Sequence, residues 1–196
     1  SYDNEMPEEI NRLITDLVCD GFFVTEQSGY DNLLEAGKDE KDIHFVGNTM
    51  IDTLVAFDAV IQENKILEEL GIAEKSFVLM TMHRPSNVDT KERLEILLNI
   101  IQKVSEKSHL IIPIHHRTKN NLIKHGLFEQ LEQNPKVIIT AALNYLSFQK
   151  LIRTCKYVLT DSGGIQEETT FRQVPCLTLR DNTERPSTVT LGTNEL

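Results

Sequence analysis

The residues of this sequence best suited to chemistry are those that favour an anionic ligand. Ser162-Gly163-Gly164 stands between a short apolar run and a helix-forming segment, so its backbone N–H groups and the helix dipole would face an incoming phosphate. Arginine forks match phosphate oxygens through paired hydrogen bonds. Four other short stretches supply cationic or neutral donors: His83 with Arg84, His115 with Arg117, Arg180, and Arg185. The combination predicts a phosphate site.

Two carboxylates extend this prediction from a phosphate to a nucleotide. Glu167 and Glu168 lie one turn into the helix that follows the glycines. A carboxylate beside a phosphate is costly unless it accepts hydrogen bonds from hydroxyl groups, and a ribose diol provides them. The loop matches neither the Walker A pattern nor G-x-G-x-x-G, which argues against a P-loop ATPase and a typical NAD-binding fold. The residues therefore favour a nucleoside diphosphate.

Taken singly, each of these residues also has a purely structural explanation. Ser162-Gly163-Gly164 fits a tight turn, and His83 or His115 fits a hydrogen-bonded structural histidine. Arg84 and Arg185 fit surface ion pairs, and the two glutamates fit partners of the helix dipole. The functional interpretation depends on all of them meeting at one place.

The elements that must position these residues form an alternating pattern. Apolar runs predict strands at 76–81, 109–114, 136–140, 157–160 and 175–179, and helical periodicity predicts helices at 89–107, 119–125, 147–154 and 165–172. Such alternation predicts an α/β fold, a parallel Rossmann-like sheet with helices on both faces. Ligands bind beyond the carboxyl ends of parallel strands, where the polar clusters stand. No closing helix is expected after the last loop.

The amino-terminal part has a similar but incomplete pattern and a different charge. Strands are expected at 22–25 and 43–46, helices from Pro7 and at 30–36, and one long or two short helices over 49–70. Residues 1–74 carry 18 acidic and 4 basic side chains, against 12 and 16 in residues 75–196. The shift suggests a boundary near residues 70–75.

Composition excludes several classes of function. The net charge of −10 and the absence of Trp argue against a nucleic-acid partner. No apolar run is long enough for a membrane helix, and no signal-peptide pattern is present. The three cysteines fit neither a disulfide framework nor a zinc site. We expect a cytoplasmic protein without a metal.

Six motifs in order resemble the non-hydrolysing UDP-N-acetylglucosamine 2-epimerases. They are M-P-E-E-I-N-R (6–12), V-G-N-T-M-I-D (46–52), T-M-H-R-P-S-N-V-D (81–89), P-I-H (113–115), T-D-S-G-G-I-Q-E-E (160–168) and L-R-D-N-T-E-R-P (179–186). The resemblance implies one half of a GT-B architecture, in which two Rossmann-like domains face a cleft. It divides the chain into a remnant of the amino-terminal domain (1–46), a hinge and connecting helix (47–74), and a UDP-binding domain (75–196).

The resemblance also implies roles for individual residues. Ser162, Gly163 and Gly164 would hold the UDP phosphates, Glu168 the ribose hydroxyls, and the backbone of 143–148 the uracil. His83 would assist the departure of UDP, with Arg84, His115 and Arg185 in contact with the nucleotide; in some members the P-x-H histidine also lies near a regulatory site. Glu8 would be an acid or base.

The implied reaction interconverts UDP-GlcNAc and UDP-ManNAc without a cofactor. UDP leaves as a base removes the C2 proton, a 2-acetamidoglucal forms, and UDP adds back after reprotonation on the other face. Family members are usually homodimers.

The sequence departs from the family pattern at several positions. Ser86 and Ser187 stand where glutamates are common, and Arg117 stands where many members have Asn. Family enzymes are about twice as long, so the isolated chain is expected to bind UDP weakly and not to epimerise. Two alternatives stay open: another GT-B UDP-sugar enzyme, such as a glycosyltransferase or a hydrolysing epimerase, and a non-catalytic nucleotide-binding module.

Overall fold

The computed structural model describes residues 7–196, with side chains from Glu9 onward, and the chain divides into two compact units, residues 1–53 and 54–196. In the first unit, β1 (Phe22–Val24) and β2 (Ile43–Phe45) pair in parallel. The helices there are α1 (Pro7–Val18), α2 (Gln27–Glu35) and the 3-10 turn η1 (Glu40–Asp42), while α3 (Thr49–Ala56) crosses the division. A small core of Phe22, Val24, Leu33 and Ile43 holds the first unit together.

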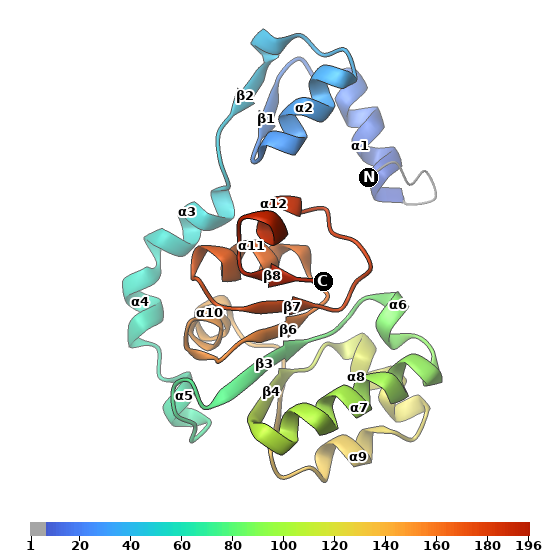
Figure 1. The fold of residues 1–196 in the computed structure, drawn as a ribbon, viewed down its shortest axis with the longest axis vertical. Coiled ribbons are helices and arrows are strands. Elements are labelled where there is room, and N and C mark those ends of the chain that lie inside the picture. The colour runs from blue at the N-terminus through green and yellow to red at the C-terminus, as the bar shows by residue number, and fades with distance from the viewer. Residues whose placement is uncertain (1–6) are drawn as a thin grey trace. The chain divides into compact units, whose positions relative to one another are not determined.

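The second unit contains a six-stranded sheet in which every pair of neighbours is parallel. Its strands are β3 (Phe77–Thr81), β4 (His109–Pro113), β5 (Val137–Thr140), β6 (Val158–Thr160), β7 (Cys176–Thr178) and β8 (Asn194–Glu195). The spatial order β5-β4-β3-β6-β7-β8 is 3-2-1-4-5-6 in chain order, as in Rossmann folds (Figure 1). The expected fold class is confirmed.

Nine helices of the described chain accompany this sheet. They are α4 (Asp58–Glu63), α5 (Ile66–Glu69), α6 (Pro85–Val88), α7 (Lys91–Lys107), α8 (His116–Lys124), α9 (Phe128–Glu132), α10 (Tyr145–Thr154), α11 (Gly163–Phe171) and α12 (Pro186–Thr190). None of the helices in residues 7–196 is long and apolar enough to cross a bilayer.

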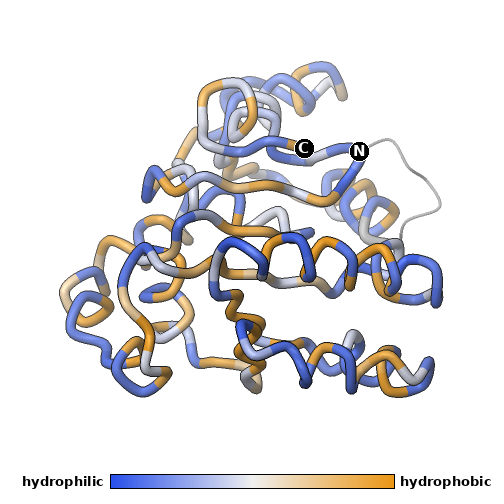
Figure 2. The backbone as a smooth tube through the Cα atoms, turned by 60° about the horizontal axis from the view of Figure 1, so that its bottom comes forward, coloured by the Kyte–Doolittle hydropathy of each residue, from blue (hydrophilic) through white to orange (hydrophobic). Residues whose placement is uncertain are grey.

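Alternation along the central strands produces two cores, one on each face of the sheet. Val78 and Met80 of β3 pack with α7, α8 and α9, whereas Phe77 and Leu79 pack with α5, α10 and α11. Successive side chains of a strand point to opposite faces, so a strand covered on both faces is apolar throughout. Figure 2 shows hydrophobic stretches along the strands and mostly hydrophilic loops between them.

Several expected helix boundaries shift because a different side chain caps the helix. The helix expected at 89–107 begins at Lys91, where Thr90 accepts a hydrogen bond from the Arg93 backbone N–H. His115 caps α8 at its first turn, so that helix begins at His116 rather than at 119. The segment 49–70 forms three short helices, not one or two.

The carboxy-terminal segment is the main correction to the expected fold. The helix α12 and the sixth strand β8 follow the last loop, where the sequence predicts no further element. Cys176 and Leu177 of β7 pair with Asn194 and Glu195 of β8. Thr178 Oγ1 donates a hydrogen bond of 2.6 Å to the buried Asn194 Oδ1. A two-residue strand is too short for periodicity to reveal.

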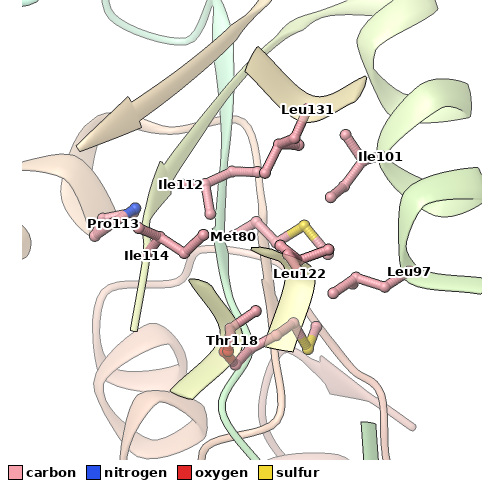
Figure 3. Close-up of a pocket in the computed structure, with 10 residues that line it drawn as sticks. Met80, Leu97, Ile101, Ile112, Pro113, Ile114, Thr118, Leu122 and Leu131 are labelled. Atoms are coloured by element: carbon pink, nitrogen blue, oxygen red, sulfur yellow. The ribbon is translucent and has the colours of Figure 1, made fainter. Parts of the chain in front are cut away.

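A small apolar cavity lies between the sheet and the helices of one face (Figure 3). Its volume is about 10 Å³, and its lining includes Met80, Leu97, Ile112 and Leu131. A cavity this small with apolar walls holds no ligand and no stable water. It belongs to the hydrophobic core, so a site must be sought at the edge of the sheet.

Candidate functional site

The order of the strands defines where a ligand site is expected. The chain runs from β3 to β4 on one side and from β6 to β7 on the other, so β3 and β6 are neighbours whose connections lead in opposite directions. In open parallel sheets, ligands bind at the carboxyl ends of such a pair. The residues that follow these two strands are Met82-His83-Arg84 and Asp161-Ser162-Gly163.

Asp161 joins the two loops at this point. Its fully buried carboxylate accepts hydrogen bonds from the backbone N–H groups of His83 (3.0 Å) and Arg84 (2.8 Å) and from Asn87 Nδ2 (3.2 Å). His83 Nδ1 lies 2.9 Å from Asp161 Oδ1. Burial by itself raises the pKa of Asp161, but the hydrogen bonds from His83, Arg84 and Asn87 outweigh burial and hold the pKa below its usual value.

The contact with Asp161 orients the His83 imidazole. Because Nδ1 faces the carboxylate, Nε2 is the ring atom left for a ligand, and the side chain is 43% exposed. The rings of His83 and His115 are 5.6 Å apart between centroids. The site thus holds a histidine with one nitrogen fixed and the other open.

The second histidine of the site, His115, has a lowered pKa. Its pKa is lowered first by burial and then by the neighbouring His116, His83 and Arg117. Its Nδ1 accepts a hydrogen bond of 3.2 Å from the Arg117 backbone N–H. A neutral ring that accepts at Nδ1 carries its proton on Nε2, so His115 is a hydrogen-bond donor at that atom.

The amino terminus of α11 forms the anion-binding part of the site. Ser162 is the N-cap, but its side chain makes no capping hydrogen bond, and its own N–H donates to Thr160 Oγ1 at 3.1 Å. The first N–H groups of any helix have no partner within the helix. The expected cradle therefore consists of the first turn at Gly163 and Gly164, while the Ser162 N–H is already in use.

Residues 180–188 fold over this helix terminus. A Cβ placed on Gly163 would lie 2.6 Å from Glu184 Oε1, so only glycine allows this approach. Glu184 pairs with Arg84 at 3.3 Å and with Arg180 at 2.6 Å. Thr183 Oγ1 donates to the buried Gln166 Oε1 at 2.6 Å and fastens the loop to α11.

Arg185 lies in the loop before α12, whereas Glu168 lies on α11. Arg185 Nε lies 3.1 Å from Glu167 Oε2. Glu168 is buried, and burial raises its pKa; Glu167 raises it further, whereas Gln149 and Arg172 lower it. A carboxylate that is poorly solvated gains from hydroxyl donors supplied by a ligand.

The contacts connect most of the predicted site residues. Seven of them stand at the carboxyl edge formed by β3, β4, β6 and the loop after β7: His83, Arg84, His115, Ser162, Gly163, Gly164 and Arg185. Glu168 lies further along α11. Glu8 belongs to α1 in the other unit, and its side chain lies outside the described residues.

Two neighbouring residues have roles that the sequence does not reveal. Asp161 holds two loops together and Glu184 pairs with Arg84 and Arg180, yet neither is among the predicted site residues. The signal for Asp161 is its place, a charged residue directly between an apolar strand and two glycines. Arg117 forms a bidentate pair with Asp89 at 2.7 and 2.6 Å, which occupies its guanidinium group.

Comparisons with known proteins agree with this geometry. The family model described as UDP-N-acetylglucosamine 2-epimerase matches residues 1–196. A UDP-N-acetylglucosamine 2-epimerase of Methanocaldococcus jannaschii is 40% identical over the whole chain and 55% of its own length. The structure of that organism's UDP-GlcNAc 2-epimerase in complex with UDP-GlcNAc and UDP superposes with a TM-score of 0.89 over 99% of this chain and 54% of the other.

A relative with a different name is also similar. The UDP-2,3-diacetamido-2,3-dideoxy-D-glucuronate 2-epimerase of Pseudomonas aeruginosa is 34% identical over the whole chain and 53% of its own length. The chain spans about half the length of the curated relatives it matches, and its fold is one half of their GT-B architecture. This protein chain belongs to the UDP-N-acetylglucosamine 2-epimerase family.

Proposed function

We propose that this chain is the UDP-binding half of a UDP-N-acetylglucosamine 2-epimerase, which interconverts UDP-GlcNAc and UDP-ManNAc. One observation carries the proposal: Asp161 ties the His83-Arg84 loop to the Ser162-Gly163-Gly164 helix terminus between β3 and β6. A cationic cluster and a helix amino terminus thereby meet at the carboxyl edge, which suits a diphosphate.

Each part of UDP has a chemically suited partner in this arrangement. The diphosphate fits the first turn of α11 at Gly163 and Gly164, with Arg84 and Arg185 as cationic donors. The ribose hydroxyls fit Glu168, whose buried carboxylate accepts hydrogen bonds. The uracil is assigned to the backbone of 143–148, where Leu143 and Phe148 pack against the core.

The proposed chemistry uses the open nitrogen of His83. Asp161 holds Nδ1, so a protonated His83 presents Nε2–H to the leaving diphosphate and stabilises the charge that develops as the C1–O bond breaks. A base removes the C2 proton, and the motif assigns Glu8 as an acid or base in this reaction. UDP then adds back to the glucal after a proton arrives at the other face of C2. No electron transfer is required.

Assembly and location follow from the same proposal. We propose that the full-length protein is cytoplasmic, as its composition indicates, and a homodimer, as the resemblance implies. The isolated chain carries the residues proposed to bind the nucleotide, and the chemistry on the sugar also requires the amino-terminal domain.

The test is to incubate UDP-ManNAc with the chain in D₂O, alone and with the amino-terminal half of the Methanocaldococcus relative added. The expected result is UDP binding by the chain alone, and deuterium at C2 of UDP-GlcNAc only in the mixture. Release of free ManNAc would indicate a hydrolysing enzyme. Failure of both the chain and the mixture to bind UDP would overturn the proposal.

A second candidate substrate follows from the Pseudomonas relative. That protein's name specifies a 2-epimerase of a diacetamido glucuronate, with 34% identity to this chain. The same UDP groups would serve it, and only the sugar would differ. Parallel assays with the two UDP-sugars decide between them by the ratio of kcat/KM.

A further inference from the structure

The carboxylate of Glu184 lies against the first residue of α11. It approaches Gly163 so closely that a Cβ there would lie 2.6 Å from Oε1 and 3.2 Å from the carboxylate carbon. The helix begins at Gly163, so the carboxylate lies beside its first turn. Anions are favoured at this end because of the unpaired N–H groups and the helix dipole.

Two arginines from separate loops hold the same carboxylate. Arg84 follows β3 and lies 3.3 Å from Glu184 Oε1, while Arg180 follows β7 and lies 2.6 Å from Oε2. Burial raises the pKa of Glu184, but its own backbone N–H together with Arg180 and Arg84 lowers it below the usual value overall. The carboxylate is therefore ionised at neutral pH, with one negative charge between two guanidinium groups.

Each of the two arginines has a second contact besides Glu184. Arg84 Nε also donates to the Asp161 carbonyl oxygen at 3.0 Å. The Arg180 side chain is only 12% exposed, and its Nη2 atom donates a hydrogen bond of 3.4 Å to Asn182 Oδ1. Removing the charge of Glu184 would thus leave two oriented cations beside the first turn of α11.

We propose that the carboxylate of Glu184 is an internal substitute for the diphosphate of the ligand. It must move away from α11, Arg84 and Arg180 before a nucleoside diphosphate can bind them. This inference rests on the proposed function and makes Glu184 a residue that sets affinity. A diphosphate carries more charge than one carboxylate and so displaces it from two cations and a helix dipole. An inorganic monophosphate makes fewer of these contacts and competes less well.

The experiment is isothermal titration of the chain and its Glu184→Gln variant with pyrophosphate, UDP and orthophosphate at fixed ionic strength. The variant is expected to bind pyrophosphate and UDP about fivefold to tenfold more tightly, because an internal competitor reduces apparent affinity by the fraction of molecules in which the site is open. Orthophosphate is expected to gain less.

Asp181→Asn is the matched control, since it removes one negative charge from an exposed position in the same loop. It should change affinity far less than Glu184→Gln. Glu184→Ala provides a second variant, and thermal unfolding confirms that each protein is folded. Unchanged or weaker pyrophosphate binding in both Glu184 variants would overturn the inference, as would an equal gain in Asp181→Asn.

The two proposals fail differently. Pyrophosphate binding that tightens without any UDP binding would support the role of Glu184 and count against the UDP assignment. UDP binding that does not tighten in the variants would leave the proposed function standing. It would contradict the inference that Glu184 substitutes for the diphosphate.

Discussion

At the scale of single residues, the site depends on how a few buried carboxylates are hydrogen-bonded. Asp161 is fully buried and surrounded by donors, which lowers its pKa, whereas Glu168 is buried with fewer donors, which raises its pKa. The first is suited to holding other residues in place. The second is suited to receiving hydroxyl groups from a ligand.

Replacing Asp161 with Asn should damage both stability and binding. The amide would present an NH₂ group to donors from His83, Arg84 and Asn87, so the free energy of unfolding should fall by about 1–3 kcal/mol. UDP affinity should fall as well, because the His83 loop loses its anchor. Urea denaturation and titration measure the two effects. A wild-type free energy of unfolding together with wild-type UDP affinity would show that Asp161 does not position the His83 loop.

Replacing Glu168 with Gln should stabilise the folded protein and weaken its binding of UDP. A carboxyl group whose pKa is raised in the folded state binds more protons than in the unfolded state, so stability falls as pH rises from about 4 through the raised pKa. Glu168→Gln removes the ionisable group and with it the loss of stability at higher pH. The variant should therefore be more stable than wild type at pH 7–8, with the gain vanishing near pH 4.

Thermal melts across pH measure this gain, with the exposed Glu132→Gln as a control expected to change little. The ribose role requires that Glu168→Gln lose more affinity for UDP than for 2′-deoxy-UDP. Equal losses for the two nucleotides would contradict that role.

At the scale of elements, the sequence predicts the strands that are buried on both faces and misses those that are not. β3 and β4 appear as apolar runs because helices cover both of their faces. β8 has two residues and α12 has five, so neither is long enough for a repeating hydrophobic pattern to be recognised. The contact of Asp161 with His83 joins positions 78 apart, which no local pattern reveals.

The missed strand can be tested through its buried hydrogen bond. Thr178→Val leaves the Asn194 amide oxygen without the 2.6 Å hydrogen bond and should cost about 1–3 kcal/mol of unfolding free energy. Thr190→Val, at an exposed position of α12, should change it by less than about 0.5 kcal/mol. Chemical denaturation compares them. A neutral Thr178→Val would argue against β8 as a packed edge strand.

At the scale of the whole molecule, the charge of the chain is unevenly distributed. The sequence carries a net charge of −10, yet the edge beyond β3 and β6 gathers His83, Arg84, Arg180 and Arg185. This local positive charge favours an anionic ligand in spite of the negative net charge. The strand order places that edge at the switch point, and the chain belongs to a family of UDP-sugar epimerases.

The most direct test of the central claim is the response of glycine amides to UDP in a ¹⁵N–¹H spectrum of the chain. Binding at the amino terminus of α11 predicts large shifts for Gly163 and Gly164 and none for Gly71 and Gly126, which stand in turns away from this edge. Shifts confined to Gly71 or Gly126, or no shift of Gly163 and Gly164 at saturating UDP, would contradict the account.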